Sequence, residues 1–242
     1  MITNPILFFL LFILTTYFIS SIPFGLVLTK LFLRTDIRKI GSGNIGATNV
    51  LRTGSKVLAI LTVILDALKP YFSLLATRFI VFPALFSYDY AKSEHIFSII
   101  SMYRADFMLY VYMSITVISL LGHCFPIYLK FKGGKGVATI FGSLFLFTNW
   151  WYFIPVLPLL AIATWLTTAF VSKKSSLSAL TTAILLPFYV SLTSIYPPHL
   201  TVELIDFFYL ISAFVIARHH ANIRRLLSGT EDNIHLSKSK SK

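Results

Sequence analysis

The chain has little charge and almost no cysteine. Charged residues make up 12% of its 242 residues, only 9 residues are acidic, and 56% are hydrophobic. An average soluble domain has about a quarter charged residues, so a water-covered surface of ordinary composition is excluded. The mean hydropathy of +0.79 agrees with this exclusion. The single cysteine, Cys124, rules out a disulfide within the chain.

Several familiar catalytic patterns are missing as well. No histidine is followed five residues later by aspartate, so the His-x4-Asp acyltransferase dyad is absent. The chain has no Gly-x-Ser-x-Gly nucleophile elbow. Its His, Cys, Asp and Glu residues form no cluster with metal-ligand spacing. We therefore expect neither a metal ion nor an organic cofactor.

Long uncharged stretches are present instead, and they are apolar on all sides, as is typical of helices surrounded by lipid. The first, Pro5–Thr29, has 25 residues without a charge, and no cleavage site follows it. The 37 residues of Gly136–Ser172 exceed one crossing of ~20 residues, so we divide them at Asn149-Trp150-Trp151. Further spans are expected at Val57–Phe86, Phe107–Leu129, Ser175–Val202 and about Leu200–Ala217. The sequence thus predicts an all-α integral membrane protein with seven transmembrane helices.

Basic residues gather on one side of this arrangement. The loops after spans one, three and five and the C-terminal segment hold 17 of the 21 Lys and Arg residues. The positive-inside rule then predicts an outer N-terminus and a cytoplasmic C-terminus. We expect the net charge of +12 to meet anionic lipid rather than nucleic acid. Residues 1–242 are expected to form one domain with a short basic tail at 237–242, and the outer loop 87–106 forms an interfacial helix or an elaboration.

The first of three unusual cytoplasmic segments runs from Asp36 to Gly54. Its Gly41-x-Gly43-x-x-Gly46 matches the dinucleotide fingerprint, but no strand precedes it, and we discard that interpretation. Glycines let a backbone approach an anion closely, and neighbouring hydroxyl, amide and guanidinium groups add donors. We predict an anion site rather than a solvated loop with basic anchors. The candidate residues are Asp36, Arg38, Gly41, Ser42, Gly43, Asn44, Thr48, Asn49 and Arg52.

The second segment contains Gly133-Gly134-Lys135-Gly136 directly before an apolar helix. This arrangement would place free backbone amides, a lysine and a helix N-terminus together. It is no Walker A motif, because Gly136 follows Lys135, and a flexible basic turn is the alternative. The candidate residues are His123, Lys132, Gly133, Gly134, Lys135, Gly136 and Thr139, with a structural role left open for His123.

The third segment runs from Ala217 to Glu231. Its candidates share one helical face at spacings near i, i+3 and i+4 and are Arg218, His219, Asn222 and Arg225. Snorkelling arginines at the end of a span are the alternative. Asp66 and Lys69, three residues apart within the second span, form either a functional site or a structural ion pair.

The three segments together resemble the acyl-phosphate:glycerol-3-phosphate acyltransferase family (PlsY type). The matching residues are Gly-Ser-Gly-Asn-Ile-Gly-Ala-Thr-Asn from Gly41, Gly-His-x-Phe-Pro with Phe-Lys-Gly-Gly-Lys-Gly-Val-Ala-Thr, and Arg-His-x-x-Asn-Ile-x-Arg-Leu-Leu-x-Gly-Thr-Glu from Arg218. The similarity runs in order from about residue 20 to residue 236. Pro70 departs from it, since the family usually has glycine there, and so does the long loop 87–106.

The resemblance implies a seven-helix enzyme of the bacterial inner membrane with its active site facing the cytoplasm. Such an enzyme moves a fatty acyl group from acyl phosphate to the first-carbon hydroxyl of sn-glycerol 3-phosphate, giving lysophosphatidic acid. On this basis we expect Ser42, Arg52, His219 and Asn222 to hold glycerol 3-phosphate. Lys135 with its glycine loop would hold acyl phosphate and the developing oxyanion, and Lys69 would contribute to substrate binding. His219 or the substrate's own phosphate would accept the proton.

Two other functions use the same features. A transporter or channel for a phosphorylated solute would need basic and glycine-rich groups, but near the bilayer midplane and often in inverted repeats. Here they lie in loops, and the sequence has no sustained repeat. A lipid-binding scaffold would explain the basic face but not the glycines. The sequence leaves the oligomeric state open, with a monomer among the options.

Overall fold

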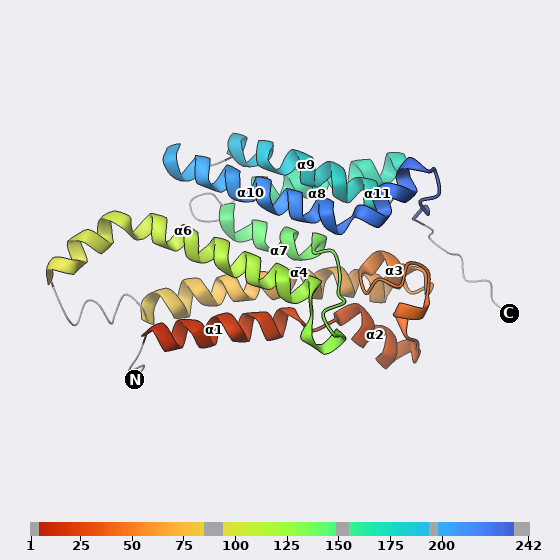
Figure 1. Ribbon diagram of the computed structural model, residues 1–242, viewed down its shortest axis with the longest axis horizontal. Coiled ribbons are helices and arrows are strands. Elements are labelled where there is room, and N and C mark those ends of the chain that lie inside the picture. Colours follow the sequence, from red (N-terminus) through yellow and green to blue (C-terminus); the bar gives the residue numbers. More distant parts are fainter. Residues whose placement is uncertain (1–4, 85–93, 149–154, 194–197, 235–242) are drawn as a thin grey trace.

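The computed structural model describes residues 5–84, 94–148, 155–193 and 198–234, and these residues form helices without any strand. This confirms the all-α prediction. The longer helices lie side by side along the long axis of the molecule (Figure 1). The α-helices are α1 (Pro5–Ser20), α2 (Phe24–Leu33), α3 (Ala47–Leu51), α4 (Lys56–Ala76), α6 (Glu94–Cys124), α7 (Val137–Thr148), α8 (Val156–Ser172), α9 (Ser175–Thr193), α10 (Pro198–Arg218) and α11 (His220–Leu227). Short 3-10 turns lie at Ile37–Lys39 and Ile127–Leu129, and a π-helical turn, Thr77–Val81, extends α4.

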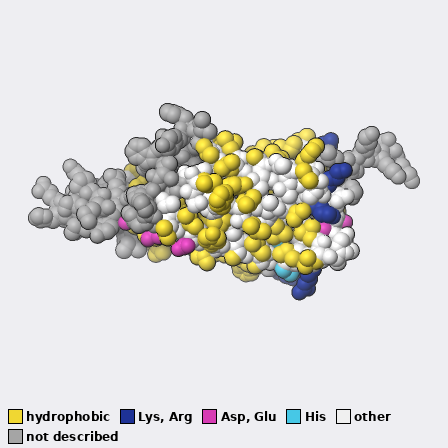
Figure 2. Space-filling model, turned by 90° about the horizontal axis from the view of Figure 1, so that it is seen from above, with side chains coloured by type: hydrophobic (Ala, Val, Ile, Leu, Met, Phe, Trp, Pro, Cys, Tyr) yellow, Lys and Arg dark blue, Asp and Glu magenta, His cyan; other side chains and the backbone are white. Residues whose placement is uncertain are grey.

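Three helical stretches in the described residues are long and apolar enough to cross a membrane, namely Lys56–Ala84, Asp106–Leu129 and Ser175–Thr193. The bent pair α1 and α2 gives a fourth if it is one span. Hydrophobic side chains are spread over the middle of the surface in Figure 2, whereas Lys and Arg gather near one end. Phe170 and Leu210, for example, are 86% and 72% exposed. Such a surface suits contact with lipid rather than with water.

The prediction of one helix over Pro5–Thr29 is wrong. The helix ends at Ser20 and resumes at Phe24 with a bend of 43°. Pro23 stands at the break and lacks the N–H that would continue the helical hydrogen bonds. The Ile22 carbonyl beside the break accepts a hydrogen bond from the Phe24 amide at 3.1 Å and another from the Lys69 ammonium at 2.5 Å. The break is thus stabilised from α4.

Two other predicted boundaries shift. α6 starts at Glu94, so the second half of the predicted outer loop 87–106 continues this helix. α9 ends at Thr193 and α10 starts at Pro198, so the extension of the sixth span to Val202 is wrong. The predicted division at Asn149-Trp150-Trp151 lies outside the described residues.

The core of the bundle brings the motif segments to one end of the molecule. α7 crosses α4 closely, since a Cβ on Gly142 would overlap the backbone of Ala67. Leu109 of α6, Leu144 of α7 and Phe208 of α10 are fully buried in the same hydrophobic core. At one end of the bundle, the loop before α3, the loop between α6 and α7, and α11 come together (Figure 1). These are the three segments that the sequence singles out.

Candidate active site

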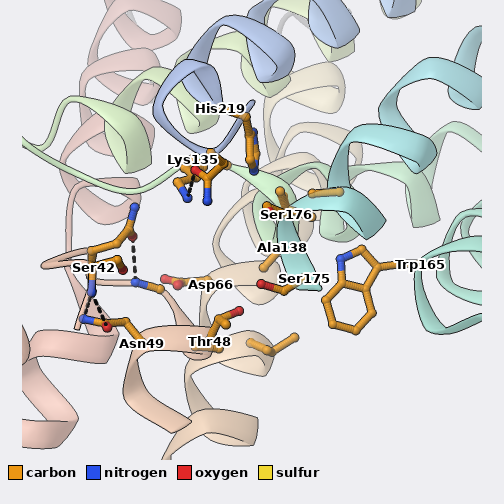
Figure 3. A pocket seen from close by; sticks show the side chains of 18 of the residues that line it. Ser42, Thr48, Asn49, Asp66, Lys135, Ala138, Trp165, Ser175, Ser176 and His219 are labelled. Atoms are coloured by element: carbon orange, nitrogen blue, oxygen red, sulfur yellow. Dashed lines mark hydrogen bonds between the residues drawn. The ribbon is translucent and has the colours of Figure 1, made fainter. Parts of the chain in front are cut away.

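A cavity of about 220 Å³ lies where the three segments meet, and α4, α7 and the corner between α8 and α9 complete its walls. Ser42 and Asn49 lie on one side of it in Figure 3, Lys135 and His219 above, and Trp165 opposite. The predicted site residues that line the cavity are Ser42, Asn44, Thr48, Asn49, Arg52, His123, Lys135, Gly136, His219, Asn222 and Arg225. Residues from positions 42 to 225 therefore face one space.

The other predicted site residues do not line this cavity. They are Asp36, Arg38, Gly41, Gly43, Lys69, Lys132, Gly133, Gly134, Thr139 and Arg218. Asp36 and Arg38 pair with each other at 2.6 Å, and the hydrogen bond from Arg38 lowers the pKa of the Asp36 carboxyl. Lys132 is exposed on the loop surface. Arg218 donates to the Gly134 carbonyl at 2.8 Å and lies over the Phe125 ring. It therefore supports the second loop from outside the cavity.

The first loop is held together by one buried side chain, that of Asn49. Its amide nitrogen donates to three backbone carbonyls of the loop, those of Ile37, Ile40 and Asn44, at 2.8–3.0 Å. Its carbonyl oxygen accepts from the Ser42 backbone amide at 3.2 Å. The guanidinium of Arg52 lies 3.4 Å from the same oxygen. Asn49 thus fixes the loop that directs Ser42 and Arg52 to the cavity.

The second loop uses its own backbone instead. The Gly133 amide donates to the Cys124 carbonyl and the Gly134 amide to the His123 carbonyl, both at 3.1 Å. The prediction of free amides is therefore wrong at these two glycines. A Cβ on Gly134 would overlap the His123 ring, so this position needs glycine for packing. Val137 and Ala138 begin α7 and line the cavity, and amides in the first turn of a helix have no partner within the helix.

Lys135 begins a chain of polar contacts across the cavity. Its ammonium donates to the Asn222 side-chain oxygen at 2.6 Å, and the Asn222 amide donates to Glu231 at 2.6 Å. Arg225 donates to the other Glu231 oxygen at 2.7 Å. Burial lowers the pKa of Lys135 to about 8. Burial raises the pKa of Glu231, but hydrogen bonds from Ser176, Asn222 and Arg225 outweigh it and leave this pKa below its ordinary value. At neutral pH Lys135 is therefore mostly charged and Glu231 is ionised.

His219 is buried at the junction of α10 and α11. Its Nδ1 lies 2.8 Å from the Val215 carbonyl oxygen. A carbonyl oxygen only accepts, so Nδ1 carries the hydrogen and Nε2 keeps a lone pair. Burial lowers the pKa of His219 to about 4, which leaves the ring neutral at pH 7. His219 is thus available as a hydrogen-bond acceptor.

Several lining residues were not among the predicted site residues: Asp66, Trp165, Ser175, Ser176, Glu231 and Asp232. Asp66 could have been selected as a site residue from the sequence, because a carboxylate within an apolar span is unusual. It pairs with Lys69 at 2.7 Å as the spacing allows, and His123 lies 3.6 Å away. Glu231 ends the third motif, so its position also indicated the site. Trp165 and the two serines stand in no motif, so nothing in the sequence indicated that they line the site.

Comparison with known proteins identifies the family. The profile described as "Glycerol-3-phosphate acyltransferase" matches residues 10–229. A glycerol-3-phosphate acyltransferase of Bartonella quintana is 41% identical over 221 residues, which cover 91% of this chain and 89% of the relative. The chain belongs to the glycerol-3-phosphate acyltransferase family. A Bordetella pertussis member is also 41% identical and matches 92% of this chain and 90% of its own. The family resemblance in the motifs is confirmed, and the chain is a membrane acyltransferase of phospholipid synthesis.

Solved structures of the family have the same fold. The crystal structure of PlsY (YgiH), an integral membrane glycerol 3-phosphate acyltransferase, in its glycerol 3-phosphate form matches with a TM-score of 0.71. It is 30% identical, and the match covers 93% of this chain and 94% of that one. The lysophosphatidic acid form matches with a TM-score of 0.69. The prediction of an integral membrane protein is thereby confirmed.

Proposed function

We propose that this acyltransferase takes its acyl group from acyl phosphate and transfers it to the first-carbon hydroxyl of sn-glycerol 3-phosphate. The hydroxyl oxygen bonds to the carbonyl carbon, the bond from that carbon to the phosphate oxygen breaks, and the hydroxyl proton is released. The products are lysophosphatidic acid and inorganic phosphate. One observation carries the proposal: Arg52, Lys135 and a helix N-terminus share a cavity with apolar side chains. Two anions and an acyl chain match that composition.

Glycerol 3-phosphate is assigned to the side formed by Ser42, Arg52, His219 and Asn222. A planar guanidinium can bind two phosphate oxygens at once, and a serine hydroxyl adds a third hydrogen bond. The lone pair of His219 Nε2 can accept a hydrogen bond from a substrate hydroxyl. Asn222 is held by Lys135 and Glu231 and so has a fixed orientation. The remaining lining residues of the first loop and Arg225 surround this subsite.

Acyl phosphate is assigned to Lys135 and the N-terminus of α7. A charged ammonium beside the reacting carbonyl stabilises the negative charge that develops there. The amides at the start of α7 add partial positive charge for a phosphate. Gly133 and Gly134 contribute by shaping the loop, because their amides already donate to backbone carbonyls.

The acyl tail is assigned to an opening towards the lipid beside α4. Val63 of α4 lines the cavity and is 44% exposed. Phe141 of α7 and Trp165 of α8 add apolar wall on the same cavity. A cavity wall that reaches the apolar outer surface supports lateral access from the bilayer. The phosphate would then meet the charged groups while the tail stays in lipid.

The proton acceptor follows from the order of basicity. His219, with a pKa of about 4, is a weak base at neutral pH. A phosphate monoester has a second pKa of about 6 and is closer to the working pH. We therefore assign proton removal to the phosphate of glycerol 3-phosphate and orientation of the hydroxyl to His219.

The same proposal includes the topology. We keep seven spans, an outer N-terminus, a cytoplasmic C-terminus and a location in a bacterial inner membrane. In support, the motif segments lie at the end where Lys and Arg gather in Figure 2, as the positive-inside rule requires of a cytoplasmic face. The residues that line the cavity come from positions 42 to 232, far apart in the sequence, which supports a single domain.

The donor is tested with purified protein and labelled glycerol 3-phosphate, offered palmitoyl phosphate, palmitoyl-CoA or palmitoyl-acyl carrier protein in separate reactions. Lysophosphatidic acid should form from palmitoyl phosphate alone, with one inorganic phosphate released per product. Product from either of the other donors, with none from palmitoyl phosphate, would contradict the proposed donor. Uptake of unmodified glycerol 3-phosphate into proteoliposomes, without product, would support the transporter, which family membership does not favour.

A further inference from the structure

Residues 228–234, here called the strap, follow α11 and border the cavity. The strap is fastened at three points that do not involve its aspartate. Lys174 donates to the Glu231 backbone carbonyl at 2.5 Å, and the Ile234 amide donates to the Lys173 carbonyl at 2.6 Å. The Glu231 carboxylate accepts from Asn222 and Arg225. The position of the next residue, Asp232, is therefore set by its neighbours.

At that position Asp232 pairs with Arg52. The Asp232 Oδ2 and Arg52 Nη2 atoms are 2.8 Å apart, and both residues line the cavity. The Arg52 side chain is 22% exposed and that of Asp232 is 63% exposed. The Asp232 carboxylate thus already binds the Arg52 guanidinium group. The proposed function assigns that group to the phosphate of glycerol 3-phosphate.

We propose that Asp232 competes with that phosphate for Arg52 and so sets the affinity of the glycerol 3-phosphate subsite. An exposed ion pair of this kind is weak, and a phosphate that binds Arg52 through two oxygens can displace it. The phosphate still meets a neighbouring negative charge, so its binding is weaker than it would be without Asp232. Specificity and affinity often depend on such a repulsive element as well as on attractive contacts.

The competition acts on substrate and product alike, and this inference rests on the proposed function. The phosphate of glycerol 3-phosphate is the same phosphate that lysophosphatidic acid carries after the reaction. A residue that weakens its contact with Arg52 therefore raises KM for glycerol 3-phosphate and also favours release of the product. Acyl phosphate is assigned to Lys135 and does not share Arg52, so its KM should not depend on Asp232.

The test compares Asp232→Asn with the wild-type protein in steady-state kinetics. Asparagine keeps the shape and removes the charge. KM for glycerol 3-phosphate and the inhibition constant of lysophosphatidic acid should both fall by the same factor, roughly two- to five-fold. KM for palmitoyl phosphate should stay the same. The control is Asp206→Asn, an exposed charge in the first half of α10, about 18 Å along the helix from Arg218. It should change neither constant.

An unchanged or higher KM for glycerol 3-phosphate in Asp232→Asn would overturn the proposal, as would equal shifts in the KM values of both substrates. A wild-type protein that forms no lysophosphatidic acid would instead contradict the proposed function. The two failures are thus distinguishable in one data set. A thermal unfolding curve of each variant in detergent shows that the compared proteins are folded.

Discussion

The two glycine-rich loops of the cavity achieve the same result by different means. In the first, Gly41 has φ of +51° and leaves room for Arg52 and Asn49, and the Asn49 side chain bonds the loop together. In the second, Gly134 leaves room for His123, and the loop is closed by its own backbone amides with Arg218 outside. One loop depends on a side chain and the other on its backbone.

The comparison changes how the glycines are interpreted. In both loops glycine makes space for a polar side chain from another position, and the charge that faces the cavity comes from Arg52 or Lys135. The two loops differ in what holds them together. Losing the Asn49 side chain should disorganise the first loop, whereas the second is closed by backbone hydrogen bonds. A Cβ added at Gly41 or at Gly134 should disturb either loop.

The largest effect is expected on turnover from Lys135→Ala. Removing the charge that we assign to the reacting carbonyl should lower kcat by about 10²- to 10³-fold. Phosphate release from palmitoyl phosphate in the presence of glycerol 3-phosphate measures it. Lys130→Ala, an exposed lysine of the same loop, is the matched control and should behave like wild type. A loss of less than tenfold in Lys135→Ala would contradict the assigned role.

Asn49→Ala should disorganise the first loop. It removes the Asn49 donor from the Asn44 carbonyl, whereas the Ile37 and Ile40 carbonyls each keep a backbone amide donor. An unsatisfied buried polar group costs about 1–3 kcal/mol. We expect a fall in thermal stability in detergent and a rise in KM for glycerol 3-phosphate. Asn44→Ala removes only an acceptor for the Gly46 amide, at 3.0 Å, and should have a smaller effect on both. Equal effects would mean that Asn49 does not organise the loop.

Gly134→Ala tests the backbone-closed loop. The added methyl group would overlap the His123 ring, and overpacking of this kind costs about 1–3 kcal/mol. Unfolding temperature is again the measurement. Gly46→Ala in the first loop is the control, because its Cβ would meet only the Asn44 side chain, at 3.4 Å. If both variants unfolded at the wild-type temperature, the packing role of Gly134 would be excluded.

The smallest of the expected effects near neutral pH is the pH dependence of kcat. Lys135 is charged below its pKa of about 8 and loses the charge above it. If the charged form is the active one, kcat falls about twofold by pH 8 and then about tenfold per further unit. Lys135→Arg keeps its charge, so any remaining activity should not show this alkaline decrease. A wild-type rate that is constant up to pH 9.5 would exclude a catalytic charge on Lys135.

Much of the fold was predictable because long apolar stretches directly indicate helices that face lipid. The break after Ser20 was missed although Pro23 marks it in the sequence, and the contact from Lys69 that stabilises it depends on the tertiary fold. Helical spacing placed Asp66 and Lys69 together but could not say that Asp66 faces the cavity while Lys69 turns to the Ile22 carbonyl. The direction in which each side chain points depends on packing between helices that are distant in sequence.

The motifs predicted which segments meet but not which atoms remain available. Lys135, His219 and Asn222 line the cavity, as the helical and loop spacing suggested. Lys132 has the same chemistry as Lys135 and differs only in the turn of the loop that exposes it. Trp165 and Asp232 were missed because one stands on a plain apolar helix and the other beyond the last motif residue. Their positions follow from the tertiary fold alone.

A crystal structure with bound glycerol 3-phosphate tests most directly whether this cavity is the site of acyl transfer. The phosphate should lie within hydrogen-bond distance of Arg52 and Ser42, with the first-carbon hydroxyl directed towards His219 and Lys135, and Asp232 displaced from Arg52. A phosphate bound at Arg38 or elsewhere outside the cavity, with the pair of Arg52 and Asp232 intact, would contradict it.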